Sequence, residues 1–257
     1  MHSDSSKNPL DKLHSTHTRE AIRERLEQGY KHSYLRDFIY GAVDGTVTTF
    51  AVVSGVAGAK LAVGIIIILG VANLIGDGFS MAVSNFLATR ADQDLRARAR
   101  KEEEHHIETI PEGEREEIRQ IYSAKGFKGE DLERIVNVIT SDVKLWVDTM
   151  IQEEFGMSMK GPNPWRAAIS TFTAFVLVGL LPLVAFIVEL IWPGSVSHPF
   201  VVSSVMTAAA FFVVGASKAR FIGEPWFISG LETLFVGGSA ASLAYLVGML
   251  LRGVALS

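Results

Sequence analysis

Residues 38–58 read FIYGAVDGTVTTFAVVSGVAG, and residues 61–88 read LAVGIIIILGVANLIGDGFSMAVSNFLA. Together the two stretches contain two charged side chains, Asp44 and Asp77. A helix needs roughly 20 apolar residues to cross a bilayer core that is about 30 Å thick. Both stretches meet that length, and the short link at residues 59–60 predicts that they cross the membrane as a helical hairpin.

Three stretches further along the chain have the same character, at about residues 167–192, 200–217 and 227–251. From 167 to 217 the only Asp, Glu, Lys or Arg is Glu189. The chain of 257 residues is therefore predicted to be an all-α membrane protein with five transmembrane helices. The overall figures, 48% hydrophobic and 20% charged, average this body with a polar segment. They exclude both a simple globular domain and a disordered chain, which needs low hydrophobicity throughout.

The polar segment lies between the second and third spans, where eight of the sixteen residues 102–117 are glutamate. Residues 88–110, ATRADQDLRARARKEEEHHIETI, contain no glycine or proline. The second span is therefore predicted to continue out of the membrane as one long helix. Proline opens a second helix over 111–124, and a third is predicted over about 129–155. We expect these helices to form a three-helix cytoplasmic domain.

Four segments follow from these elements. We assign 1–36 to an N-terminal tail with an amphipathic surface helix, 37–88 to transmembrane helices 1 and 2, 89–165 to the cytoplasmic helical domain, and 166–257 to transmembrane helices 3 to 5. The surface helix is predicted over residues 16–32, where apolar side chains recur at helical spacing; they are Ala21, Ile22, Leu26 and Tyr30. Four histidines in this segment are expected to be solvated, namely His2, His14, His17 and His32.

Lysine and arginine orient the spans, because they are enriched in cytoplasmic loops. Basic residues precede the first span, fill the insert and recur at Lys218 and Arg220, whereas the opposite side has only Lys60 and Arg252. The N-terminus and the insert are therefore expected to be cytoplasmic and the C-terminus outside. We see no cleavable signal peptide or targeting motif. We accordingly expect a prokaryotic plasma membrane, with a vacuolar membrane as the alternative.

Two further properties exclude classes of site. The sequence has no cysteine, which excludes disulfides, thiolate metal sites and cysteine nucleophiles. The formal net charge of -4 does not favour nucleic acid as a partner.

Carboxylates inside the spans are the first functional candidates, since an aspartate at the centre of a membrane helix costs about 2.5–3.5 kcal/mol on insertion scales. Asn73, Asp77 and Met81 follow i, i+4, i+8 spacing and share one helix face. Together with Asp44 they offer carboxylate, amide and thioether ligands to a divalent cation. The alternative is a structural hydrogen-bond network between packed helices.

Three other features of the spans have simpler interpretations. Gly41 and Gly45 form a small-xxx-small pair, which allows close helix contact or dimerisation. Glu189 is expected to be a rim residue. Glu232 is expected to pair with Lys218 or with the nearby arginine at 220.

The insert holds a second set of candidate ligands. Glu103 and His106 lie three residues apart, as do Glu114 and Glu117, so each pair shares a helix face. Met150 and Glu154 have i, i+4 spacing in the third predicted helix. Carboxylate, imidazole and thioether ligands suit ferrous, manganous, cobalt or zinc ions better than cuprous. The alternative is that the glutamates form a solvated charged face.

Several segments carry a likeness to a known family: Asp44-Gly45, Ser80-Met81, PEGEREEI at 111–118, PNPWRAAISTFTAF at 162–175, and KARFIGEPWFISGLETLFVGGSAASLAYLVG at 218–248. With these features the chain resembles the vacuolar iron transporter family of divalent-metal/proton antiporters. The resemblance extends over nearly the whole chain from Tyr34 onward.

The resemblance implies five spans, a homodimer and a three-helix metal-binding domain on the cytosolic side. The family's translocation residues, an aspartate and a methionine, match Asp44 and Met81. Its metal-domain ligands match five residues of the insert, which are Glu103, Glu114, Glu117, Met150 and Glu154.

The sequence departs from the family pattern at four places. Asn73 stands where the family has a glutamate, and Asp77 stands where a small residue is usual, so the carboxylate has moved one turn along the same face. His106 replaces a further glutamate, and Ile151 replaces the second of two adjacent methionines. An added imidazole and a lost thioether favour zinc or a more mixed metal selectivity.

We therefore predict a transporter, and not an enzyme, that exports Fe²⁺ or a similar ion (Mn²⁺, Co²⁺ or Zn²⁺) from the cytoplasm in exchange for protons. The metal is cargo, and no prosthetic group is expected. The predicted ligands are Glu103, His106, Glu114, Glu117, Met150 and Glu154 in the insert, and Asp44, Asn73, Asp77 and Met81 in the membrane between two protomers. Protonation of Asp44 or Asp77 from outside is expected to release the ion.

Two other functions compete with transport. Glu103-x-x-His106 has the spacing of ferritin-like di-iron sites, which predicts a membrane-anchored iron oxidase. Such sites need two Glu-x-x-His repeats, and the sequence supplies one locus. The other alternative is a metal sensor or storage protein that does not transport.

Overall fold

The computed structural model describes residues 9–28 and 33–255 of the chain. The chain divides between Ser33 and Tyr34. In the first part, α1 (Pro9–Thr16) and α2 (Arg19–Gln28) replace the single helix predicted over 16–32. The Thr18 hydroxyl accepts a hydrogen bond from the Ala21 amide at 3.2 Å and so caps α2. Within α2, Ala21 and Ile22 are half-buried. Tyr30, His2 and His32 lie outside the described residues.

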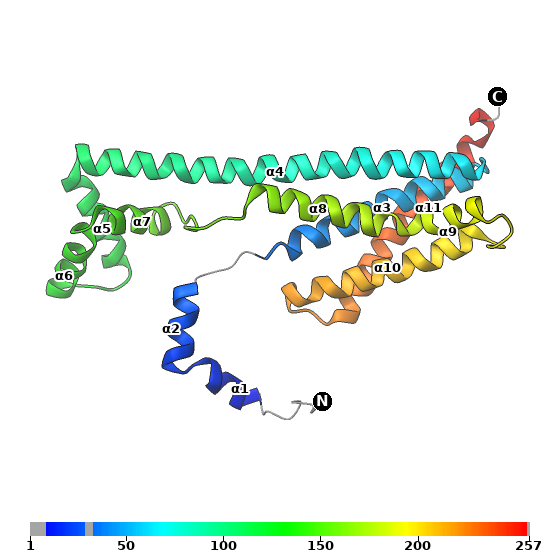
Figure 1. Cartoon of the computed structure of the whole chain (residues 1–257). Coiled ribbons are helices and arrows are strands. Elements are labelled where there is room, and N and C mark those ends of the chain that lie inside the picture. The colour runs from blue at the N-terminus through cyan, green and yellow to red at the C-terminus, as the bar shows by residue number, and fades with distance from the viewer. Residues whose placement is uncertain (1–8, 29–32, 256–257) are drawn as a thin grey trace. The chain divides into compact units, whose positions relative to one another are not determined.

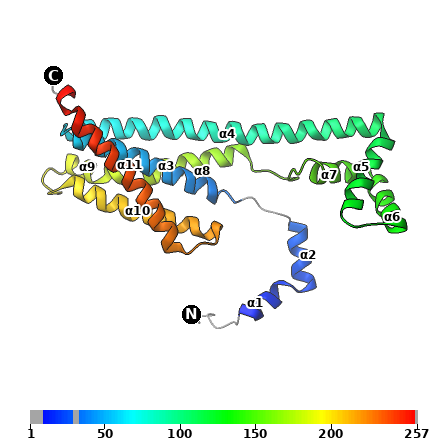
Figure 2. The same cartoon turned by 180° about the vertical axis from the view of Figure 1, so that it is seen from behind.

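The second part is built of nine helices over residues 34–255, with no strand among the described residues. They are α3 (Leu35–Gly58), α4 (Val63–Thr109), α5 (Pro111–Ala124), α6 (Gly129–Thr140), α7 (Val143–Glu153), α8 (Pro164–Gly179), α9 (Leu181–Ile191), α10 (Pro199–Ile222) and α11 (Trp226–Ala255). α3 packs against α4, α8, α10 and α11, while α5, α6 and α7 gather at the C-terminal end of α4 (Figures 1 and 2).

Among the described residues, four helices are each long and apolar enough to cross a membrane: α3, α4, α10 and α11. The predicted third span, residues 167–192, is not one helix. It is formed by α8 and α9, which are bent by 50° at their junction. Pro182 explains the break, because proline has no amide hydrogen and its ring clashes with the carbonyl four residues earlier. The Ser203 hydroxyl donates to the Pro182 carbonyl at 2.6 Å and ties the break to α10.

The insert agrees with its prediction in two helices and differs in the third. α4 runs unbroken for 47 residues to Thr109, and α5 begins at the expected proline. The third predicted helix, 129–155, is interrupted at Ser141-Asp142 and forms α6 and α7. Asp142 is the N-cap of α7, since its carboxylate accepts a hydrogen bond from the Leu145 amide at 3.0 Å.

Two hydrophobic cores hold these elements. One lies among the apolar helices and includes Phe50, Leu74, Phe175, Leu183 and Phe211. The other lies within the insert, where α4, α5, α6 and α7 contribute Ile107, Ile118, Val136, Val147 and Met150. The insert therefore has a packed interior of its own, which fixes the ends of α4 and α5 relative to each other.

Gly41 and Gly45 lie one turn apart at the crossing of α3 with α8. A methyl group at Gly41 would lie 2.2 Å from the carbonyl oxygen of Thr171, and one at Gly45 would lie 2.4 Å from that of Phe175. Only hydrogen at these positions allows the two backbones to approach this closely. The small-residue pair therefore makes a close helix contact within the chain, against α8.

We predict that Gly45→Ala lowers the melting temperature of the detergent-solubilised protein, because overpacking a well-packed contact costs about 1–3 kcal/mol. Gly64→Ala is the matched control, since a methyl group at Gly64 meets nothing within 4 Å. Thermal unfolding followed by tryptophan fluorescence measures both. Equal melting temperatures for the two variants would contradict the close α3–α8 contact.

Candidate metal sites

The first candidate site lies where α4 ends and α5 begins. The backbone reverses at Ile110, whose amide donates to the His106 carbonyl at 2.7 Å. This turn brings Glu114, in the first turn of α5, back onto Glu103 and His106 of α4. One ligand atom from each of these three residues lies within 4.8 Å of the others. The His106 Nδ1 atom is 3.4 Å from Glu114 Oε1 and 3.8 Å from Glu103 Oε1.

The two carboxylates are almost completely buried, with Glu103 1% and Glu114 2% exposed. The Oε2 atom of each has no hydrogen-bond partner among the described residues. A buried carboxylate oxygen without a hydrogen-bond partner is costly, because it has lost its contact with bulk water. A divalent cation is the kind of ligand that compensates two buried carboxylates.

The electrostatics of this cluster agree with its geometry. Burial raises the pKa of Glu103 to about 8, and the negative charge of Glu114 adds to that effect. The pKa of Glu114 is also raised, by burial and then by Glu117, although His106 opposes the shift. Burial, with Glu117 and Glu114, likewise raises the pKa of Glu154. The carboxylates therefore resist ionising together unless a positive charge lies among them.

Basic side chains of the insert pair with other acids. Arg100 pairs with Asp148, Arg119 with Glu133, and Lys125 with Glu153. Among the described residues, no Lys or Arg forms an ion pair with Glu103 or Glu114. The basic side chains of these pairs therefore do not neutralise the cluster.

The other predicted ligands of the insert lie differently. Glu117 and Glu154 are exposed, and they are near enough to the buried pair to shift its pKa values. Met150 is fully buried in the hydrophobic core of the insert, and Ile151 lies in the same core. The structure thus gathers Glu103, His106 and Glu114 closely, with Glu117 and Glu154 at the rim of that cluster.

The second candidate site lies on α3 and α4. Asp44 and Asp77 are both exposed on the single chain. The Asn73 amide is turned toward α3, where it donates to the Thr48 hydroxyl at 3.2 Å and the Thr49 hydroxyl at 3.5 Å. Met81 is half-buried and packs against the core of the apolar helices. Asn73 therefore makes the helix-to-helix hydrogen bonds of the structural alternative, while the two aspartates face outward.

A polar cluster that the sequence interpretation missed continues this face toward the insert. The Asn85 amide donates to Asp37 Oδ1 at 2.9 Å and to the Thr171 hydroxyl at 2.8 Å, joining α4, α3 and α8. Asn85 lies one turn beyond Met81, so the i, i+4 series that begins at Asn73 contained the signal. Asp37 lies two turns before Asp44 on α3. Polar atoms thus line α3 and α4 from the start of α3 to Asn73.

A stripe of small residues lies beside Asp77 on α4. Its members recur every four residues and are all exposed on the single chain; they are Ala72, Gly76, Ser80, Ser84 and Ala88. A methyl group at Gly76 would meet nothing within 4 Å. Stripes of this kind are enriched where membrane helices pack against one another.

The remaining polar residues have local roles. The Glu189 carboxylate accepts hydrogen bonds from the Gly194 and Val196 amides and closes the loop after α9. The predicted pairing of Glu232 is confirmed, because Lys218 Nζ donates to its carboxylate at 2.8 Å. His17 Nδ1 donates a hydrogen bond to the nearby Leu13 carbonyl at 2.9 Å.

Comparison with known proteins agrees with these features. A model of the VIT family matches residues 35–249. A vacuolar iron transporter of Toxoplasma gondii is 33% identical over 225 residues, which cover 85% of this chain and 74% of the relative. Vacuolar iron transporter 1 of Arabidopsis thaliana is 32% identical, covering 82% of this chain and 83% of the relative. A vacuolar iron transporter of Plasmodium falciparum is 29% identical, covering 85% and 82% respectively. The chain is therefore an integral membrane protein. It belongs to the VIT family, the family of the vacuolar iron transporters.

Proposed function

We propose that this protein exports Fe²⁺ or a similar divalent cation from the cytoplasm in exchange for protons. Membership of the VIT family supports metal transport. The observation that carries the proposal is the cluster of Glu103, His106 and Glu114, which holds two buried carboxylate oxygens without a partner. Its ligand types suit Fe²⁺, Mn²⁺, Co²⁺ and Zn²⁺, and His106 extends the range toward zinc.

The insert acts as the capture site in this proposal. Glu117 and Glu154 at the rim attract cations from solution, and the buried pair with His106 binds them. Met150 serves as a soft ligand only if its thioether moves out of the hydrophobic core. The alternative function, a ferritin-like iron oxidase, has less support. The described residues contain one Glu-x-x-His cluster, whereas a di-iron site needs two.

The transport site is formed by Asp44, Asp77 and Met81, with Asn73 as a further ligand or as a positioning residue. Two outward-facing aspartates in membrane-spanning helices need a partner, since a lipid-facing carboxylate is costly. The adjacent small-residue stripe of α4 is suited to a second copy of the chain. We propose that two protomers meet along this face and enclose the cation between their aspartates.

Protons drive release in this scheme. Neutralising Asp44 or Asp77 from the far side removes most of the attraction for the cation, which then leaves. The positive-inside distribution of Lys and Arg supports a cytoplasmic insert and a C-terminus outside. The membrane is a prokaryotic plasma membrane in this proposal or, as the names of the relatives indicate, a vacuolar membrane. Export from the cytoplasm is the direction in either case.

Metal binding at the insert is expected to strengthen as pH rises toward 8. Glu103 holds a proton near neutral pH because its pKa is about 8 in the metal-free protein. Binding displaces that proton, so the apparent affinity rises by up to about tenfold per pH unit. Titration calorimetry with Mn²⁺ at pH 6, 7 and 8, in buffers of different ionisation enthalpy, measures both affinity and proton release. Proton release that is unchanged in Glu103→Gln would contradict the assignment.

The same raised pKa affects stability in the metal-free state. Glu103 stabilises the fold most at pH values below 4.5, which is the ordinary pKa of its carboxyl group. That stabilisation is lost as pH rises through about 8, its pKa in the folded protein. Faster hydrogen exchange of α5 amides at pH 8 than at pH 6, after correction for the intrinsic rate, is therefore expected without metal. Saturating Mn²⁺ should remove the difference.

Glu114→Gln is expected to weaken Mn²⁺ binding by at least about tenfold, because loss of even an outer-shell partner typically costs about 10–100-fold in metal affinity. Glu116→Gln is the matched control two residues away, since Glu116 is exposed and pairs with Arg119. The two variants have the same net charge. Equal affinities would show that the insert attracts cations by its overall charge alone.

Asp44→Asn is expected to reduce Fe²⁺ flux into proteoliposomes under a pH gradient by at least about tenfold, for the same reason. Asp94→Asn is the matched control, because it removes the same charge from an exposed position in the polar part of α4, and it should retain flux. Undiminished flux in Asp44→Asn would overturn the proposed transport site. Metal binding with no flux in the unmodified protein would favour a sensor or storage role instead.

A further inference from the structure

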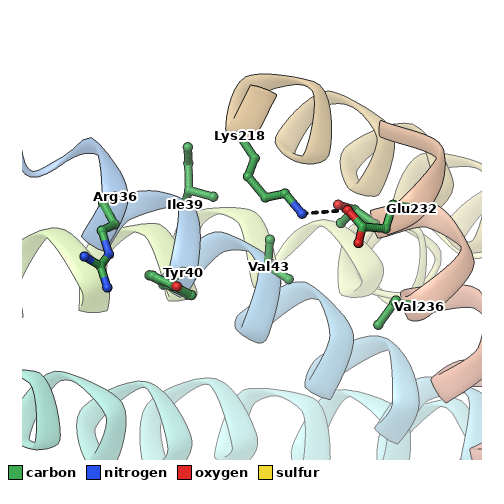
Figure 3. A pocket seen from close by; sticks show the side chains of 8 residues that line it. Arg36, Ile39, Tyr40, Val43, Lys218, Glu232 and Val236 are labelled. Atoms are coloured by element: carbon green, nitrogen blue, oxygen red, sulfur yellow. Dashed lines mark hydrogen bonds and ion pairs between the residues drawn. The ribbon is translucent and has the colours of Figure 1, made fainter. Parts of the chain in front are cut away.

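A pocket of about 470 Å³ lies among α3, α10 and α11, apart from both candidate metal sites. Its apolar wall includes Ile39, Val43 and Val236. Figure 3 shows Arg36 and Tyr40 toward one side and Lys218, paired with Glu232, toward the other. The pocket thus joins an apolar chamber to charged side chains from three different helices.

The charged residues place the pocket near one end of the spans. Arg36 lies in the first turn of α3, and Lys218 lies in the last turns of α10. Trp226 begins α11 at the same end, where the residue is 61% exposed and its ring lies 5.9 Å from that of Phe212, centroid to centroid. Tryptophan in such a position is typical of the boundary between hydrocarbon and headgroups. The cations therefore lie near headgroup depth, with the apolar wall extending toward the hydrocarbon.

The charges of the pocket do not cancel. Lys218 Nζ lies 2.8 Å from Glu232, and this pair is neutral overall. The Arg36 guanidinium lies 5.6 Å from the centre of the Tyr40 ring, a cation–π contact that leaves its charge in place. Two cations and one carboxylate give the pocket a formal charge of +1, which one phosphodiester anion would balance.

We propose that this pocket binds an anionic phospholipid from the leaflet at the basic ends of the spans. The phosphate lies between Arg36 and Lys218, and an acyl chain lies along Ile39, Val43 and Val236. Basic pockets between membrane helices on the cytoplasmic side are suited to anionic headgroups. A soluble phosphate would satisfy the cations but leave the apolar wall unused, and a zwitterionic lipid would leave the charge of +1 unbalanced.

Lipid in this pocket connects α3 to α10 and α11. Val43 precedes Asp44 directly on α3, so the lipid contacts the helix that carries one of the proposed transport carboxylates. Binding itself does not depend on transport. The proposal therefore stands or fails independently of the proposed function.

Native mass spectrometry of the full-length protein in detergent tests the proposal. The probes are phosphatidylglycerol, phosphatidylcholine of the same chains, and glycerol phosphate. The double variant Arg36→Gln/Lys218→Gln should lose about 30-fold in affinity for phosphatidylglycerol, from two cation contacts near a headgroup. Arg166→Gln/Arg220→Gln is the matched control, which removes two exposed cations outside the pocket lining and should bind within about twofold of the unmodified protein.

Two single variants sharpen the result. Glu232→Gln removes the carboxylate and releases Lys218, so phosphatidylglycerol should bind more tightly. Val43→Trp fills the apolar chamber without changing charge and should weaken phosphatidylglycerol binding. The proposal is overturned if the double variant binds like its control, if phosphatidylcholine binds as tightly as phosphatidylglycerol, or if glycerol phosphate binds as tightly as the lipid, which would indicate a site for free anions.

Discussion

Close approach of backbones around α3 is the contact on which the membrane-spanning part depends. Lipid tails are as apolar as leucine, so helices in a bilayer gain little from burying apolar surface against each other. They associate instead through packing and hydrogen bonds, and both require short distances. Gly41 and Gly45 allow α8 to lie directly against α3. The place of Asp44 beside α4, and the pocket shared with α10 and α11, follow from how α3 is held.

The spans were predictable because crossing a bilayer imposes a minimum length on uncharged sequence. Breaks within helices were not found, because they arise from local backbone effects that composition does not register. Pro182 divides the third span, and Asp142 starts a new helix by accepting a backbone hydrogen bond. Proline is a known helix breaker and aspartate a known N-cap residue. A residue-by-residue search for caps and prolines would have located both breaks.

Spacing predicted which ligands share a helix face, but it gave no information on how faces meet. The turn at Ile110 decides that Glu114 joins Glu103 and His106, and no periodicity encodes that turn. Spacing also gives no information on which hydrogen-bond partners compete with a metal ion for a side chain. Spacing alone predicts Asn73 as a ligand, yet its amide donates to two threonines of α3. Asn85 had the right spacing and was missed, because an amide alone is a weak signal without knowledge of Asp37 beside it.

The unbroken course of α4 gives the molecule a mechanical property. No glycine or proline occurs between Gly78 and Pro111, so this stretch has no hinge residue. From Met81 to Glu103 it extends for about 33 Å at 1.5 Å per residue. Glu103 and His106 at one end, and Met81 at the other, are thus fixed to one unbroken length of helix. Rotation of the insert about the axis of α4 therefore also turns the membrane-spanning end of α4, without any intermediate chain of side-chain movements.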